Sequence, residues 1–88
     1  MSEVVIEDEL RQIVAEVAEI DPGSVDLSGT LADAGVDSLM AMEIAVDVER
    51  RYGLSFTVEE LKAITTFGSL VALTQARLAE QEAASSGR

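Results

Sequence analysis

The sequence contains no histidine and no cysteine. Without cysteine the chain has no disulfide and no thiolate for a metal, and without histidine it lacks the other main ligand of zinc sites. A catalytic serine would also lack its usual base, because histidine most often accepts the serine proton near neutral pH. Lys62, the only lysine, is the single candidate for a serine–lysine pair. We therefore predict no catalytic residue and no metal site.

Basic residues are scarce in the first half of the chain. Residues 1–49 hold thirteen acids and one base, a net charge of −12, whereas residues 50–88 hold four acids and five bases, a net charge of +1, which together give −11. Nucleic acid requires a basic surface and is therefore disfavoured as a partner. The acidic charge either complements a basic patch on another protein or serves only to keep the chain in solution. With no membrane-length apolar run and no leader-like start, we expect a cytoplasmic monomer that binds no membrane.

The apolar residues recur mostly at spacings of three and four, which indicates amphipathic helices. Four helices are predicted, over residues 3–19, 38–52, 57–63 and 66–81. The fold class is therefore all-α, a four-helix bundle with a short third helix and a long loop between the first two. Val25, Leu27 and Leu31 are expected to hold this loop against the core. Eighty-eight residues make one domain, expected over 1–82, and residues 83–88 are predicted to be a flexible tail.

The second helix begins within the segment 35–39, which reads GVDSL. Asp37 is placed to cap the helix, and Ser38 is its first residue, where no preceding turn covers the hydroxyl. Leu39 is expected to anchor the helix start in the core. A helical wheel then places an apolar strip beside carboxylates, and we predict that it binds partner proteins. The predicted partner-binding residues are Met40, Met42, Glu43, Val46, Asp47 and Glu49.

These segments resemble the acyl carrier proteins. The resemblance covers about residues 4–80 and depends on GVDSL at 35–39, the acidic helix ending in ERRYG at 49–53, and TFGSL at 66–70. It implies a helical bundle on which Ser38 carries a covalent 4′-phosphopantetheine group from coenzyme A, flanked by Asp37 and Leu39 of the motif. Acyl groups would be held as thioesters on the terminal thiol of that arm, so the chain is expected to be a carrier and not an enzyme.

The resemblance also implies partners. These are a phosphopantetheinyl transferase, an acyltransferase or acyl-activating ligase, and a ketosynthase or other synthase enzyme. Aspartate before the serine favours an acyl carrier over a peptidyl or aminoacyl carrier. Met40, where an acidic residue commonly follows Ser-Leu, favours a specialised pathway such as polyketide biosynthesis over fatty-acid synthesis. The initial methionine and short tail favour a discrete protein.

A function of another class remains open, and a further one is disfavoured. An acidic helical adaptor would use the second helix for docking and carry no prosthetic group, so a transferase would leave its mass unchanged. A calcium site is suggested by the aspartates of the long loop, but the EF-hand spacing fails because a loop starting at Asp21 has Ala32 at its twelfth position. Ala41 and Ala45 either leave room for an acyl chain between helices or permit close helix packing.

Overall fold

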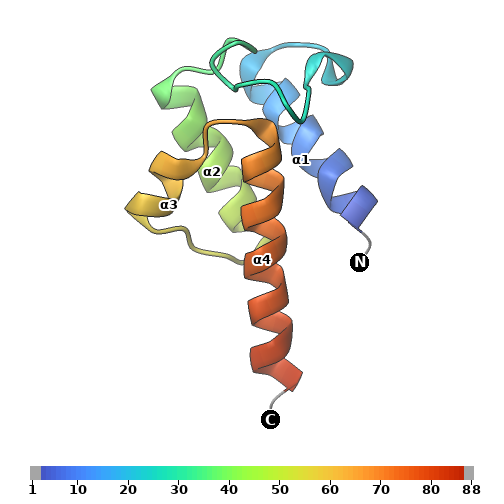
Figure 1. Ribbon diagram of the computed structural model, residues 1–88, viewed down its shortest axis with the longest axis vertical. Coiled ribbons are helices and arrows are strands. Elements are labelled where there is room, and N and C mark those ends of the chain that lie inside the picture. Colours follow the sequence, from blue (N-terminus) through green and yellow to red (C-terminus); the bar gives the residue numbers. More distant parts are fainter. Residues whose placement is uncertain (1–2, 87–88) are drawn as a thin grey trace.

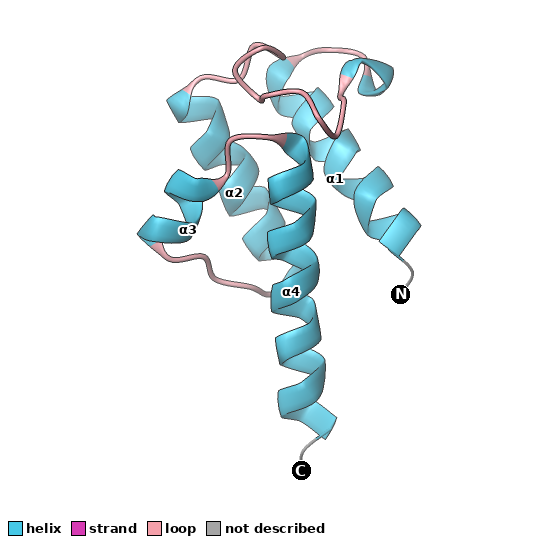
Figure 2. Cartoon of the chain, in the orientation of Figure 1, coloured by secondary structure: helices cyan, strands magenta, loops and turns pink. Residues whose placement is uncertain are grey.

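The protein is an all-α bundle, as the sequence predicts. A computed structural model describes residues 3–86, with side chains described for residues 5–81. In chain order the elements are α1 (Glu3–Ala18), the 3₁₀ turn η1 (Pro22–Ser24), α2 (Ser38–Tyr52), α3 (Val58–Ala63) and α4 (Phe67–Ser86). Over the described residues no strand forms, and the only β-type contact is an isolated bridge between Thr30 and Thr66 (Figure 2).

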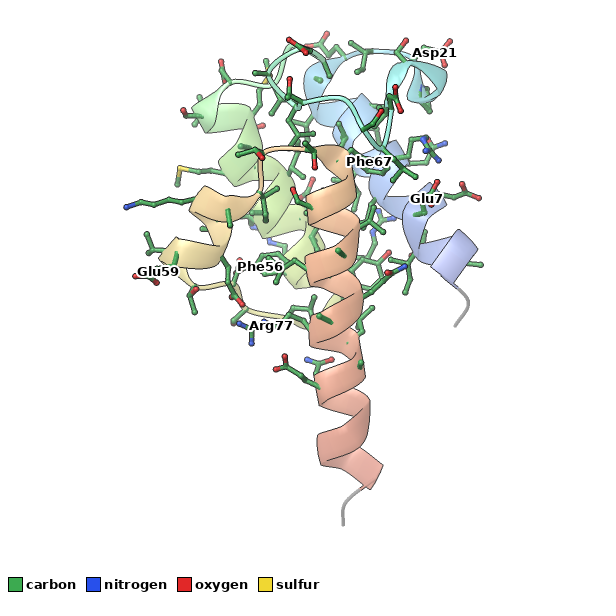
Figure 3. The ribbon with its side chains drawn as sticks, in the orientation of Figure 1. Glu7, Asp21, Phe56, Glu59, Phe67 and Arg77 are labelled. Atoms are coloured by element: carbon green, nitrogen blue, oxygen red, sulfur yellow. The ribbon has the colours of Figure 1, made fainter. Side chains whose placement is uncertain are left out.

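The core lies where α1 packs against α2 and α4 (Figure 1). Its most deeply buried apolar side chains come from these three helices and are 0 to 2% exposed: Leu10, Ile13, Val14, Ile44, Val48, Phe67 and Leu70. Phe67 points from the first turn of α4 toward α1, where the Arg11 guanidinium lies 5.2 Å from the ring centroid (Figure 3). Burial of these side chains supplies the main driving force for folding.

The long loop between α1 and α2 crosses one end of the bundle (Figure 1). Val25 and Leu31 are buried, as predicted, and Val36 joins them, but the Leu27 side chain is 42% exposed. The expectation that Leu27 packs into the core is therefore wrong. Its backbone holds the loop instead, because the Leu27 carbonyl accepts a hydrogen bond of 3.0 Å from the Gly68 amide at the start of α4.

The helix ends largely follow local sequence signals. Gly53 adopts a left-handed conformation (φ 67°) immediately after α2, as predicted. Thr57 and Glu60 form the predicted capping box of α3. The exception is α4, which continues to Ser86 instead of ending near Gln81. In Figure 1 its C-terminal part projects beyond the other helices. The alanine-rich sequence after Gln81 favours this extension, since alanine has the highest helix propensity.

The predicted domain limits and the predicted flexible tail stay predictions. The domain limits of 1–82 and the flexibility of residues 83–88 are not decided by the helix bounds, and residues 87–88 lie outside the described part. Within residues 3–86, no helix has both the length and the apolar character needed to cross a membrane.

Candidate functional site

Ser38 is exposed at the first position of α2. Asp37 has an extended backbone (φ −90°, ψ −177°), and its Oδ1 accepts a hydrogen bond of 2.8 Å from the Met40 amide. This interaction satisfies one of the amides that the first turn of a helix leaves unpaired. Gly35 provides the sharp turn into this segment with φ 91°, a conformation that favours glycine. The predicted cap and the exposed serine hydroxyl are therefore both present.

Beside Ser38, a pocket of about 470 Å³ lies between α2 and α3. Apart from Ser38 and Lys62, its lining is apolar, and it is formed by Leu31, Ala41, Met42, Ile44, Ala45, Val58, Leu61, Ile64 and Leu70. Ala41 and Ala45 thus both border this pocket, and Ala45 is also buried, with 5% of its surface exposed. A cavity of this size, apolar with one polar edge, is suited to holding an apolar chain.

The helix α3 forms the outer wall of this pocket, and none of its residues is fully buried. Polar contacts help to hold it there. One carboxylate oxygen of Glu60 accepts a 2.8 Å hydrogen bond from the Thr57 amide, and the other forms an ion pair with Arg77 of α4. Figure 3 shows Arg77 extending from α4 toward the side of the molecule that carries α3. The hydrogen bond from Arg77 and that from the Thr57 amide lower the pKa of Glu60.

The segment between α2 and α3 is fixed by a further carboxylate. The Phe56 amide donates a 2.9 Å hydrogen bond to Oε2 of Glu49, which is half-buried. Glu49 therefore has a local structural role that the sequence did not predict, and its participation in a partner face stays a prediction. Glu43 and Asp47 are exposed on α2, as the helical wheel predicts.

The apolar side chains at the start of α2 face differently from the prediction. Leu39 is 66% exposed and does not anchor the helix in the core, whereas Met40 is half-buried and packs against the core. Met42 is 61% exposed and Val46 is 40% exposed, as a partner-binding strip requires. The corrected apolar strip is Leu39, Met42 and Val46. Ile44 and Val48 are buried, and Met40 shares their face because it precedes Ile44 by one helical turn.

Two residues were not predicted from sequence to border the pocket. Val58 of α3 is 61% exposed, and with Lys62 it borders the pocket. Neither belongs to a motif, because their relation to Ser38 depends on how α3 lies against α2. Among the described residues, no three potential ligands of the aspartate, glutamate, cysteine or histidine type lie together in a metal-binding arrangement. The site thus combines an accessible hydroxyl with an apolar pocket and an apolar, acidic surface.

Comparison with known proteins gives consistent matches. The family model described as "Phosphopantetheine attachment site" matches residues 8–74. An acyl carrier protein of Rhodococcus erythropolis is 41% identical over 73 residues, covering 82% of this chain and 80% of the relative. The non-reducing polyketide synthase azaA of Aspergillus niger is 38% identical over 68 residues. That match covers 77% of this chain but only 3% of the synthase, so the chain spans a very small part of such relatives.

A solved structure of the same architecture supports the match in sequence. The hexanoyl form of the acyl carrier protein from the actinorhodin polyketide synthase of Streptomyces coelicolor superposes with a TM-score of 0.74. It is 32% identical to this chain, and the alignment covers 83% of this chain and 90% of the other. The similarity therefore extends over most of the chain.

Proposed function

Because this chain belongs to the acyl carrier proteins, whose 4′-phosphopantetheine group is covalently attached, we propose that Ser38 is its attachment point. The observation that carries this assignment is the exposed Ser38 hydroxyl at the first position of α2, beside the α2–α3 pocket. The residues present fit the group, since the hydroxyl is open to solvent and the pocket can accept an apolar chain. When bound, the group supplies a thiol that holds acyl chains as thioesters.

Attachment requires a partner enzyme. The chain has no histidine to deprotonate Ser38, so a phosphopantetheinyl transferase must supply the base. The Oγ atom forms the new bond to the phosphorus of the pantetheine phosphate, the pyrophosphate bond of coenzyme A breaks, and adenosine 3′,5′-bisphosphate leaves. Asp37 maintains the helix start, so that Ser38 is presented to the transferase in a fixed backbone conformation.

The partner face combines the strip of Leu39, Met42 and Val46 with the exposed carboxylates Glu43 and Asp47. Carboxylates attract basic enzyme surfaces and accelerate encounter, while flexible apolar side chains adapt to several shapes. A carrier must visit successive enzymes and leave each one, so weak and rapidly formed complexes suit it. The expected partners are the transferase, an acyltransferase or acyl-activating ligase, and a ketosynthase or related synthase enzyme.

The pathway we favour is polyketide biosynthesis. Sequence similarity to a polyketide synthase and structural similarity to a carrier from a polyketide system support this choice. The α2–α3 pocket offers a tethered acyl chain shelter from water, because Ala41 and Ala45 leave space that larger side chains would fill. Burial of a methylene group there contributes roughly 0.8 kcal/mol.

The test is intact-mass analysis after incubation with coenzyme A and a broad-specificity phosphopantetheinyl transferase. The wild-type chain should gain one full pantetheinyl increment, and Ser38→Ala should gain none. Ser55→Ala, which removes another exposed hydroxyl, is the matched control and should be loaded normally. A full increment on Ser38→Ala would disprove the attachment point. No increment on the wild-type chain would instead favour an adaptor without a prosthetic group.

A further inference from the structure

Within residues 3–86, each arginine is either paired with a carboxylate or distant from Ser38. Arg11 is paired with Glu7 at 3.0 Å, and Arg77 is paired with Glu60. Arg50 and Arg51 lie in the last turn of α2, about 18 Å along the helix from Ser38 at 1.5 Å per residue. None of these four arginines is therefore both unpaired and close to the start of α2.

Lys62 is the remaining cation within residues 3–86. It lines the same pocket as Ser38 and is the only charged residue among those that line it. Its side chain is exposed, and no carboxylate of the described part lies within 4 Å of its ammonium group. Its ammonium group is carried on a flexible four-carbon stem.

The position of Lys62 is set by the contacts of α3. Lys62 lies in the last turn of α3, two residues after Glu60, whose carboxylate is held by both the Thr57 amide and Arg77. These contacts fix the helix against α4 and leave Lys62 on the side that borders the pocket. The cation is thus carried by an anchored element and not by a free loop.

A phosphodiester on Ser38 would be attracted to such a cation. At neutral pH the diester carries one negative charge, and it would be joined directly beside the Asp37 carboxylate in the strongly acidic half of the chain. The Asp37 side chain already occupies the Met40 amide, which reduces the number of free amides at this helix start. Lysine is a common partner of phosphate groups and acts as a point charge.

We propose that Lys62 is the positioning residue for the prosthetic group, pairing with the phosphodiester on Ser38 and directing the arm toward the α2–α3 pocket. This inference rests on the proposed attachment at Ser38. The pairing opposes the repulsion from Asp37 and biases the first bonds of the arm toward Leu61 and Val58 instead of solvent. It is weakened by salt, because both charges are exposed to water.

Lys62 is the only lysine in the sequence, so its signals can be observed selectively. Lysine labelled with ¹³C and ¹⁵N gives one lysine side-chain spectrum, which is recorded for the apo and holo proteins at low salt and at high salt. We expect the Lys62 signals to shift on loading and to return toward the apo position as salt is added. Nuclear Overhauser contacts are also expected between the arm methyl groups near the phosphate and the side chains of α3.

Charge-matched variants separate this role from general electrostatics. In holo Lys62→Gln the contacts between arm and α3 should weaken, corresponding to a roughly 1.5- to 5-fold lower population of the docked arm, as for an exposed ion pair. Lys62→Arg should retain them. Arg50→Gln removes the same charge at the far end of α2 and should leave them unchanged.

Intact mass is measured on every sample, so the two proposals fail in different ways. Absence of the pantetheinyl increment on the wild-type chain overturns the proposed function and this inference with it. A full increment with identical Lys62 signals in the apo and holo proteins overturns only the role of Lys62. Equal losses of arm contacts in Lys62→Gln and Arg50→Gln would likewise refute a specific pairing.

Discussion

Replacement of Gly68 by alanine tests how tightly the long loop is attached to α4. A Cβ atom at position 68 would lie 2.8 Å from the Leu27 carbonyl oxygen, a separation that Cβ atoms essentially never show. The opposing atom belongs to the backbone, so the loop itself must move. The same carbonyl accepts the 3.0 Å hydrogen bond from the Gly68 amide, and this contact would be strained or lost.

Two opposing effects determine the expected magnitude. Alanine is favoured over glycine inside a helix by about 1 kcal/mol. Overpacking costs about 1 to 3 kcal/mol, and a weakened hydrogen bond costs about 0.5 to 1.5 kcal/mol more. We therefore expect Gly68→Ala to reduce the free energy of unfolding by about 0.5 to 3.5 kcal/mol, although helix propensity alone predicts a gain. For a domain of this size the melting temperature should fall by roughly 2 to 28 °C.

Thermal unfolding followed by far-ultraviolet circular dichroism measures the effect. Ala76→Gly, at an exposed position of the same helix, calibrates the propensity difference and should cost about 1 kcal/mol. Amide chemical shifts of the loop and of Leu31, which lines the α2–α3 pocket, should change in Gly68→Ala. The reasoning is refuted if Gly68→Ala melts higher than wild type by about the amount that Ala76→Gly melts lower.

Two further predictions concern carboxylates near the site. Asp37→Ala should lower the free energy of unfolding by about 1 kcal/mol, because the Met40 amide loses its cap. Asp37→Asn should retain most of the stability. Equal stabilities of the two variants in urea unfolding would contradict this assignment. The Arg77 and Thr57 contacts lower the pKa of Glu60 from its usual 4.5, so its contribution is complete above that pH and is lost as pH falls through the folded-state value. The stability difference between wild type and Glu60→Gln should therefore shrink on acidification below pH 4.5, and a constant difference would exclude the ion pair as its source.

Helix limits were predictable where their causes are local. The Asp37 cap, the Thr57–Glu60 capping box and the left-handed Gly53 each depend on atoms within about one helical turn. Such contacts form whatever the rest of the chain does, so residue types at fixed offsets are sufficient to identify them. The end of α4 was predicted too early, because residues 82–86 contain no proline or glycine to end the helix.

The orientation of α2 was not predictable in the same way. Apolar side chains occur almost all round its first three turns, so several rotations of the wheel bury a similar number of them. Ile44 and Val48 are buried, and the bundle packs Met40 beside them while Leu39 is exposed. This difference in the first turn changed the composition of the proposed partner face.

The sequence by itself determined the all-α class, most helix limits, the exposed serine with its cap, and the acidic character of the first half, because these depend on local hydrogen bonds, periodicity and composition. Only the tertiary structure decided which apolar residues of α2 face outward and whether Ala41 and Ala45 border space or a neighbouring helix. It also brought Lys62 to the same pocket as Ser38. The physical reason is that a pocket between helices is a property of how the helices pack, and side chains distant in sequence share it only after the core has fixed their positions.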